Sequence, residues 1–503
     1  MPISFLILFE EKQYIILLLV VGYIIHYYIL KNNKFNKDDY HNFLIPRIVP
    51  YKIPWIGSAI PYGTNPTKFL SECREKYGNI FTLKLAGKNI TFLLDPLVLP
   101  LIFKEKNFVF SSFADKIVQQ AFSIDKSTTA RMSHQARNPQ KYLGGENLLK
   151  LIENTKIKLV DTILNKIKSN DNFDNKPEWK QGYFYDFIAR ILWISSTEGF
   201  FGKGFAEEDM WNDFYTFDNK FPILISGIPK IFAWSALKSQ KKLCQLFTKQ
   251  RLFRENENEW VTYRSKEFLK IFDQEQFMNI QFSLIWALMA NTIPIAFWTI
   301  ANIISNSHIK MRCEQEIENF TKVDPKTKQI NFIELSKFIY IDACINEALR
   351  LTSSSLVVRE ALEDSKIHVE YLNQTYLIKK GETIAFYPPL THIDSEIYGD
   401  DAKEYNPSRF LPNKDGSKKI FMKNGKEVKL HLVPFGGGSS MCPGRHYARE
   451  EIKLLVIYCI YYIDFKLHDK IPSIDIKRAG LGVYSPLNDI KFEYRLKYHI
   501  QVD

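Results

Sequence analysis

The residues best suited to chemistry form a glycine-rich loop that carries one cysteine. Residues 434–445 read PFGGGSSMCPGR, and a patterned helical run, HYAREEIKLLVIYCIYYI, continues from there. Peptide N–H groups and the helix dipole stabilise a thiolate at a helix N-terminus, so we expect a lowered pKa for Cys442 and a soft metal ligand. The glycines let the backbone approach a flat cofactor closely. The loop alone leaves open an anion-binding turn, a buried packing cysteine and a catalytic thiol with a distant histidine.

A second set of residues could form an ion pair. Glu347 and Arg350 stand three positions apart in SKFIYIDACINEALRL, which has the pattern of a helix. Three-residue spacing places both side chains on one face, where they can pair. Such a pair is common on solvated helices, so by itself it does not define a site.

A long apolar stretch must position further residues. Residues 277–308 contain no charged side chain, which by length alone would suit a membrane span. We reject that interpretation because five Asn and Gln residues and Pro294 would carry polar or backbone costs in lipid. We expect a buried helix that kinks or opens near 290–294, because proline removes one backbone hydrogen bond. Asn291 and Thr292 should then border a groove.

The remaining elements place the chain in the mainly α class with small β-sheets. We expect a hairpin at 81–94, a strand region at 366–377 and a final strand pair around 486–489. The chain has 503 residues, 46% hydrophobic and 24% charged, enough for one large core or two smaller ones. Its net charge is +11, but no Lys and Arg run is interleaved with aromatics, so we exclude a nucleic-acid partner. Six cysteines without a C-x-x-C pair indicate a reducing compartment.

The N-terminus carries a candidate membrane anchor. Residues 14–30 read YIILLLVVGYIIHYYIL, without Asp, Glu, Lys or Arg, and three lysines follow by residue 37. The positive-inside rule places the body in the cytoplasm, as for a single-pass protein of the endoplasmic reticulum membrane. A cleaved signal peptide is the poorer interpretation, because no small-residue cleavage site follows. We therefore divide the chain into an anchor (1–34), a proline-rich hinge (35–57) and a catalytic domain (58–503).

The loop motif resembles a known signature. The spacing Phe435-x-x-Gly438-x-x-x-Cys442-x-Gly444 resembles the haem-binding signature of the cytochrome P450 haem-thiolate monooxygenases. Residues 286–294 and 341–500 resemble the sterol-hydroxylating branch typified by cholesterol and oxysterol 7-alpha-hydroxylases. The resemblance implies the cytochrome P450 fold, with haem between a long buried helix and the helix after the cysteine loop.

The resemblance also implies roles for individual residues. Cys442 would be the axial thiolate ligand of haem b, and Thr292 would orient water for proton delivery beside Asn291, where most members have an acidic residue. Glu347, Arg350 and Arg409 would form a buried charge network that holds the cysteine loop. The implied pocket walls are apolar and include, by position, Trp286, Ala290, Leu356, Val357, Val483 and Tyr484.

Two departures from the family concern the haem propionates. Ser440 stands where most members have Arg or His, and Trp260-x-x-x-Arg264 lies too late to match the usual early Trp-x-x-x-Arg. We nominate Arg359 as the propionate partner and Arg131 as a weaker candidate.

The implied activity is insertion of one oxygen atom from O2 into a sterol or related lipid, with electrons from an NADPH-dependent flavoprotein reductase of the cytochrome P450 reductase type. A basic surface near Arg445, Arg449 and Lys453 would suit that partner. One alternative is a haem-thiolate isomerase or dehydratase that acts on a lipid hydroperoxide without a reductase; Thr292 argues against it. Another is a haem-based sensor without turnover.

Overall fold

The computed structural model describes residues 22–23, 43–135, 142–167, 178–248, 251–254, 257–323, 330–332 and 334–497. The expected membrane anchor lies outside the described residues, apart from Gly22 and Tyr23. The chain forms two compact units, which together contain the region we assigned to one catalytic domain. The first comprises the chain up to Val109 and Val357–Tyr387, and the second comprises Phe110–Leu356 and Pro388–Asp503.

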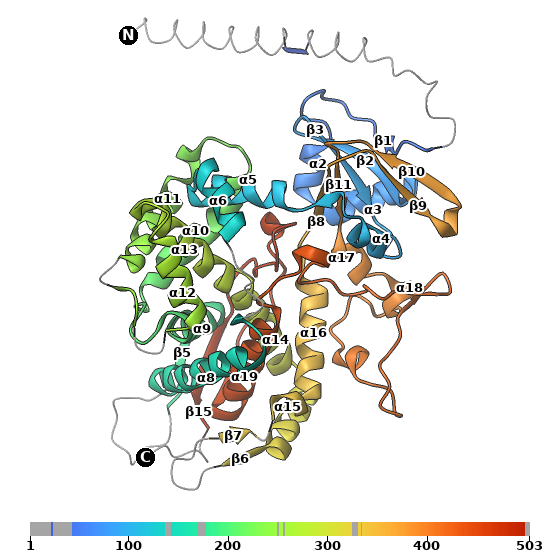
Figure 1. The fold of residues 1–503 in the computed structure, drawn as a ribbon. Coiled ribbons are helices and arrows are strands. Elements are labelled where there is room, and N and C mark those ends of the chain that lie inside the picture. Colours follow the sequence, from blue (N-terminus) through green and yellow to red (C-terminus); the bar gives the residue numbers. More distant parts are fainter. Residues whose placement is uncertain are drawn as a thin grey trace, which may run out of the picture. The chain divides into compact units, whose positions relative to one another are not determined.

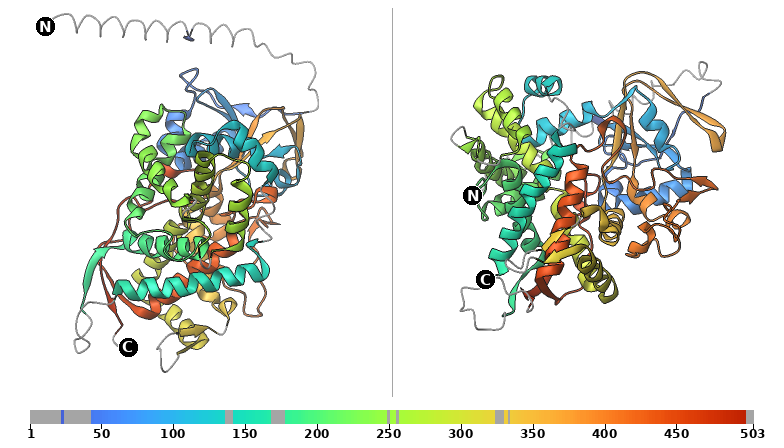
Figure 2. Two further views of the ribbon diagram at one scale, coloured as in Figure 1. Left: turned by 60° about the vertical axis from the view of Figure 1, so that its left-hand side comes forward. Right: turned by 60° about the horizontal axis from the view of Figure 1, so that its bottom comes forward.

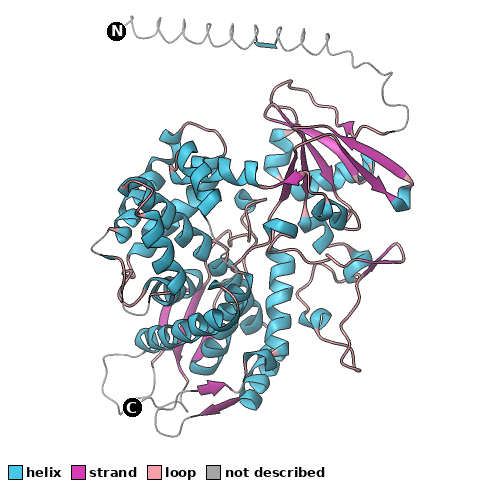
Figure 3. Ribbon diagram, viewed as in Figure 1, coloured by secondary structure: helices cyan, strands magenta, loops and turns pink. Residues whose placement is uncertain are grey.

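The first unit is built on a six-stranded sheet (Figure 3). Its strands, in spatial order, are β1 (Arg47–Ile48), β2 (Ile80–Leu85), β3 (Lys88–Leu93), β11 (Thr383–Phe386), β8 (Val357–Ala361) and β4 (Phe108–Val109). β2 and β3 pair antiparallel, which confirms the expected hairpin. The strand region expected at 366–377 forms a second hairpin, β9 (Ser365–Val369) with β10 (Gln374–Ile378). The described helices of this unit are α2 (Ala59–Thr64), α3 (Pro66–Tyr77) and α4 (Leu99–Lys104).

The second unit is mainly helical (Figure 1). Its longer helices are α5 (Ser111–Phe122), α6 (Lys126–Gln135), α8 (Gly145–Ile167), α9 (Phe184–Phe201), α10 (Met210–Ile225), α11 (Trp234–Cys244), α12 (Glu259–Phe268), α13 (Gln274–Met289), α14 (Thr292–Ser305), α15 (Ser307–Phe320), α16 (Ile339–Thr352) and α19 (Arg445–Tyr462). Its short helices include η2 (Lys230–Ala233), α17 (Pro388–His392), α18 (Ser395–Tyr398), η7 (Pro407–Phe410), η8 (Gly438–Ser440) and η9 (Ile476–Arg478). Its strands are β5 (Lys180–Tyr183), β6 (Thr321–Val323), β7 (Ile330–Phe332), β12 (Met422–Lys423), β13 (Lys426–Glu427), β14 (Ile463–Leu467) and β15 (Lys491–Leu496).

The core of this unit surrounds α14. This helix packs against α9, α16 and α19, and α8 runs beside α19 (Figure 2). Nearly every side chain of α14 is buried, as the absence of charge in its sequence requires.

The stretch without charged side chains, 277–308, is helical. It is interrupted at the place expected from Pro294. α13 ends at Met289 and α14 begins at Thr292, so the interruption lies at Ala290 and Asn291. In the described part of the chain, Gln274–Ser305 is long and apolar enough to cross a membrane, but 78% of its apolar window is buried inside the protein. This burial supports a core helix rather than a second span.

The final strand pair expected around 486–489 is wrong, because the residues there pair with other parts of the chain. The Asp475 N–H donates to the Ser485 carbonyl, and the Leu487 N–H donates to the Ser473 carbonyl. These are short bridges rather than a hairpin of two strands. The last long strand, β15, pairs instead with β14 and β5. Pro486 cannot donate a ladder hydrogen bond, which limits pairing at that point.

Candidate active site

The cysteine loop is a closed turn at the start of α19. The Cys442 N–H donates to the Phe435 carbonyl at 2.9 Å, which closes the loop across seven residues of sequence. Gly436 and Gly438 have φ values of 69° and 63°, in the left-handed region that favours glycine. The peptide N–H groups of Gly444 and Arg445 lie near the thiol sulfur and favour its charged form. Cys442 is also partly accessible, whereas the other five cysteines are buried.

The expected lowering of the Cys442 pKa is wrong for the protein without a ligand. Burial raises this pKa above its ordinary value, and the N–H groups of Gly444 and Arg445 with the Arg445 charge only partly oppose it. The position of Cys442 at a helix start indicates the groups that lower its pKa. It does not indicate how strongly burial of the sulfur raises that pKa. A bound metal cation supplies the missing positive charge, because a thiol that ligates a metal is deprotonated.

Glu347, Arg350 and Arg409 meet in the interior of the second unit. Arg350 holds Glu347 with two parallel bonds of 2.7 Å, and Arg409 Nε donates to the same carboxylate at 3.2 Å. The Glu347 and Arg350 side chains are fully buried. Remaining guanidinium protons go to backbone carbonyls, including those of Ala402 at 2.5 Å and Glu404 at 3.1 Å. Each buried charge is therefore both paired and hydrogen-bonded, as burial requires.

The route from this network to the cysteine loop runs through Tyr398 and His431. Arg409 donates to the Tyr398 carbonyl, and the Arg350 guanidinium lies over the Tyr398 ring at 4.8 Å. The Tyr398 hydroxyl is 3.0 Å from both Nδ1 and the carbonyl oxygen of His431. His431 stands three residues before Pro434, where the loop begins. The network thus reaches the loop indirectly, through a tyrosine that the sequence did not single out.

Thr292 and Asn291 lie at the helix interruption, and both side chains have partners. The Thr292 hydroxyl donates to the Leu288 carbonyl at 2.7 Å. Its single proton is committed, so its oxygen can only accept from a further group. The Asn291 side-chain oxygen accepts from the Val483 N–H at 2.9 Å.

The expected pocket residues fall in both units. Trp286, Ala290, Leu356, Val483 and Tyr484 belong to the second unit, and Val357 belongs to β8 of the first. Val483 and Tyr484 are tied to their surroundings: the Tyr484 N–H donates to Thr352 and its carbonyl accepts from Trp298 at 2.6 Å. Trp286 stacks on Phe221 and donates to Asp218.

The arginines nominated for the propionates differ in burial. Arg359 is 4% exposed, which excludes an ordinary surface arginine; its Nη1 donates to the Val358 carbonyl and its guanidinium lies 5.4 Å from the Phe103 ring. Burial lowers the pKa of Arg359. Arg131 is exposed on α6 and donates to the Ile271 carbonyl at 3.4 Å. Arg264 lies over Trp260 in α12 and donates to Gln281 at 3.0 Å.

The expected basic surface on α19 is wrong at Lys453. This side chain is 2% exposed and is neutralised by Asp342 at 3.0 Å and Glu450 at 3.3 Å. Arg449 donates to Asn346 at 2.8 Å, while Arg445 donates to the Cys442 carbonyl at 3.1 Å. The burial of Lys453 follows from its place on α19. This helix is buried on nearly all sides around residue 453, so the lysine lies in the interior.

Sequence analysis missed Glu451, a buried acid on α19. Its carboxylate accepts from the Ser196 hydroxyl and, at 2.8 Å, from the Tyr447 hydroxyl. Glu451 is fully buried, and burial raises its pKa to about 7. The two hydrogen bonds lower the pKa and offset only part of this effect. The available signal was periodicity, since Tyr447, Glu451 and Leu455 share the buried face.

We expect Glu451 to make stability fall as pH rises. Between about pH 4.5 and pH 7 the native state keeps a proton that the unfolded chain has released, so the free energy of unfolding decreases across that window. Glu451→Gln cannot ionise, and it should be about 3 kcal/mol more stable than the wild type near pH 8. Urea unfolding at a series of pH values measures this. A difference between variant and wild type that does not change with pH would contradict it.

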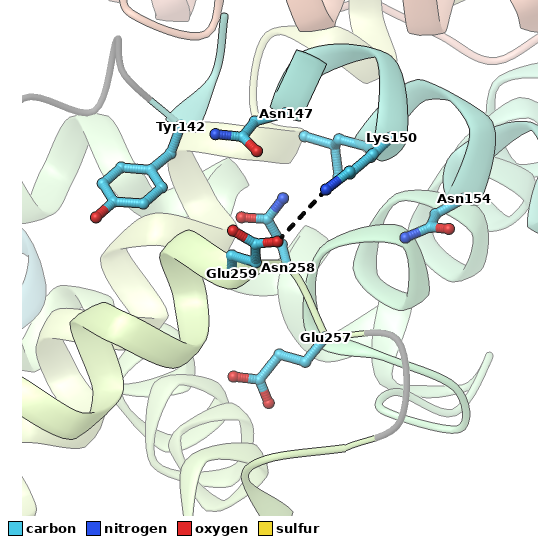
Figure 4. A pocket seen from close by; sticks show the side chains of 8 residues that line it. Tyr142, Asn147, Lys150, Asn154, Glu257, Asn258 and Glu259 are labelled. Carbon is cyan, nitrogen blue, oxygen red and sulfur yellow. Dashed lines mark ion pairs between the residues drawn. The ribbon is translucent and has the colours of Figure 1, made fainter. Parts of the chain in front are cut away.

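A separate surface pocket lies between the start of α8 and the chain before α12 (Figure 4). Its volume is about 200 Å³, and an ion pair lies at its wall, with Lys150 3.7 Å from Glu259. Its lining residues are Tyr142, Asn147, Lys150, Leu151, Asn154, Glu257, Asn258 and Glu259. None of them belongs to the site expected from the sequence.

Comparison with known proteins agrees with this fold. The cytochrome P450 family model matches residues 47–492. Cytochrome P450 7A1 of Oryctolagus cuniculus is 30% identical over 89% of this chain and 92% of its own length. Cholesterol 7-alpha-monooxygenase of Cricetulus griseus is 31% identical, with the same coverage. The 7-alpha-hydroxycholest-4-en-3-one 12-alpha-hydroxylase of Homo sapiens is 27% identical over 88% of this chain and 91% of its own length.

A solved structure shares the fold. Retinoic acid-bound cyanobacterial CYP120A1 superposes with a TM-score of 0.67 at 18% identity, over 91% of this chain and all of that one.

A partly accessible thiol on a closed glycine loop, with peptide N–H groups that favour its charged form, is the arrangement expected of a haem-thiolate protein. The chain belongs to the cytochrome P450 family. It is a monooxygenase whose cofactor is haem with cysteine thiolate ligation, and Cys442 would supply that thiolate. The loop fits that cofactor, because the sulfur has one accessible face and N–H donors that favour its charged form.

Proposed function

We propose that this chain hydroxylates a sterol or related lipid, with O2 and electrons from an NADPH-dependent flavoprotein reductase. The observation that carries the proposal is the match with proteins named for sterol hydroxylation, which extends over nearly nine-tenths of the chain. The apolar character of Ala290, Leu356 and Val483 suits a lipid substrate.

In this proposal the haem, when bound, supplies the activation of O2, and the protein supplies the ligand and the protons. Cys442 holds the iron, and the N–H groups of Gly444 and Arg445 share the charge of its sulfur. Thr292 accepts a hydrogen bond from a water and fixes its position, since the threonine's own proton goes to Leu288. Asn291 contributes no proton, because an amide does not ionise.

We expect Thr292→Ala to separate electron use from product formation. Loss of the acceptor leaves the water unfixed, so product per NADPH should fall by about a hundredfold, within the range of positioned proton transfer. Hydrogen peroxide release should rise in step. Thr292→Ser keeps the hydroxyl and is the matched control. Unchanged coupling in the alanine variant would refute the role of Thr292.

Substrate class can be tested without turnover. We expect cholesterol or an oxysterol to shift the spin state of the ferric holoenzyme, because an apolar ligand in the pocket displaces water from beside the iron. A saturated fatty acid of similar apolar area is the control. A shift with the fatty acid and none with the sterols would contradict the sterol assignment.

Membrane association of a single-pass protein with a cytoplasmic body, in the endoplasmic reticulum, is part of the proposal. Besides the N-terminal segment, its support is an exposed apolar group at η2 and the start of α11. Ile231, Phe232 and Trp234 are each about two-thirds or more exposed. Contiguous exposed apolar side chains mark interaction surfaces, and tryptophan favours the lipid interface.

A further inference from the structure

The interruption between α13 and α14 leaves the Ala290 carbonyl without its helical partner. In an α-helix the N–H of each residue donates to the carbonyl four positions earlier. Pro294 has no N–H, so the Ala290 carbonyl receives nothing from its own helix. The ladder resumes one residue later, where the Ile295 N–H donates to Asn291 at 3.2 Å.

Arg478 supplies the missing donor from far along the chain. Its Nη2 lies 3.3 Å from the Ala290 carbonyl oxygen, and its side chain is almost completely buried. Asp218 of α10 neutralises the guanidinium through a direct ion pair. The other oxygen of Asp218 accepts from the Trp286 indole N–H at 2.9 Å. One buried ion pair therefore joins α10, α13, the helix interruption and η9.

The segment that carries Arg478 makes a second bond to the same interruption. The Val483 N–H donates to the Asn291 side chain, and a Cβ on Gly482 would collide with that amide. The segment is itself fixed, because Ser354 bonds to the Gly482 carbonyl through both its N–H, at 2.7 Å, and its hydroxyl, at 2.8 Å. The interruption is thus held from outside the helix at two successive residues.

We propose that Arg478, held by Asp218, is a positioning residue: by bonding to the Ala290 carbonyl it keeps the helix open at 290–291 and so places the Thr292 hydroxyl. This inference rests on the proposed role of Thr292. Arg478 acts through the backbone, and it takes no part in bond making.

The sharpest variant removes both charges together. Arg478→Met with Asp218→Asn leaves no unpaired buried charge, and the asparagine can still accept from Trp286. The bond to the Ala290 carbonyl, the ion pair and a 3.5 Å bond from Arg478 to the Asp218 carbonyl are lost. The matched control is Lys423→Met with Asp394→Asn, which removes another largely buried pair of the same unit, between β12 and the N-cap of α18.

Two measurements on the holoenzyme decide the proposal. We expect the amides of residues 291–293, 295 and 296 to exchange hydrogen about tenfold faster in the Arg478/Asp218 variant, because a bond from a charged donor is lost. Product per NADPH should fall, while the thiolate-type band of the reduced carbon monoxide complex stays intact. Adding Pro294→Ala restores an N–H for the Ala290 carbonyl, so exchange should return toward the wild-type rate.

Two results would overturn the proposal: exchange no faster than in the control pair, or faster exchange that Pro294→Ala leaves unchanged. The exchange measurement needs no substrate. If the wild type hydroxylates no sterol, the proposed function fails, yet exchange and its rescue still decide whether Arg478 positions the helix interruption.

Discussion

Replacing Cys442 by alanine should abolish both the thiolate-type Soret band of the reduced carbon monoxide complex and all turnover. In the proposed site this side chain would supply the thiolate that ligates the iron, and the peptide N–H groups of Gly444 and Arg445 favour its charged form. Thiolate ligation sets the electronic character of the iron, so a protein that kept haem without it would have a different spectrum and no oxygen chemistry. The measurement is a reduced carbon monoxide difference spectrum of the purified protein.

A matched control separates ligation from general damage. Cys73→Ala changes a buried cysteine on α3, in the other unit, and should leave the band in place. Persistence of the band in the Cys442 variant would show that another group ligates the iron.

Replacing Glu347 by glutamine should have the largest effect on stability. The Glu347 carboxylate is fully buried and forms ion pairs with Arg350 and Arg409. Glutamine keeps the shape of this side chain but removes its negative charge. Breaking a buried pair in this way costs about 3–5 kcal/mol. That is a large part of the total stability of a typical protein. We expect a lower urea midpoint and loss of haem from much of the purified protein.

The control for this prediction is an exposed pair. Glu267→Gln breaks a surface contact of 2.9 Å with Lys270, where both side chains are solvated. Its effect should stay within about 1 kcal/mol. Equal effects of the two substitutions would mean that the buried network contributes no more than a surface ion pair.

Features encoded by nearby residues were predictable from the sequence. Pro294 fixed the place of the helix interruption because a missing N–H has a local consequence. The spacing of Glu347 and Arg350 placed them on one helix face, and the glycines around Cys442 indicated a tight loop. The hairpin at β2 and β3 followed from its alternating pattern.

Features that depend on distant contacts were not predictable. Asp218 and Arg478 are 260 positions apart, and neither stands in a motif. Lys453 reads as a surface charge until Asp342 of another helix neutralises it. The pKa of Cys442 depends on how far the fold desolvates the sulfur, which no local pattern records.

Isotope-labelled O2 tests whether this chain inserts an oxygen atom from O2 into a sterol, as we propose. The purified holoenzyme is incubated with flavoprotein reductase, NADPH and cholesterol or an oxysterol, and the product is analysed by mass spectrometry. We predict a hydroxylated sterol that carries one labelled oxygen atom and is formed only when reductase and NADPH are present. Absence of label, together with rapid conversion of a lipid hydroperoxide in the absence of reductase, would contradict the account.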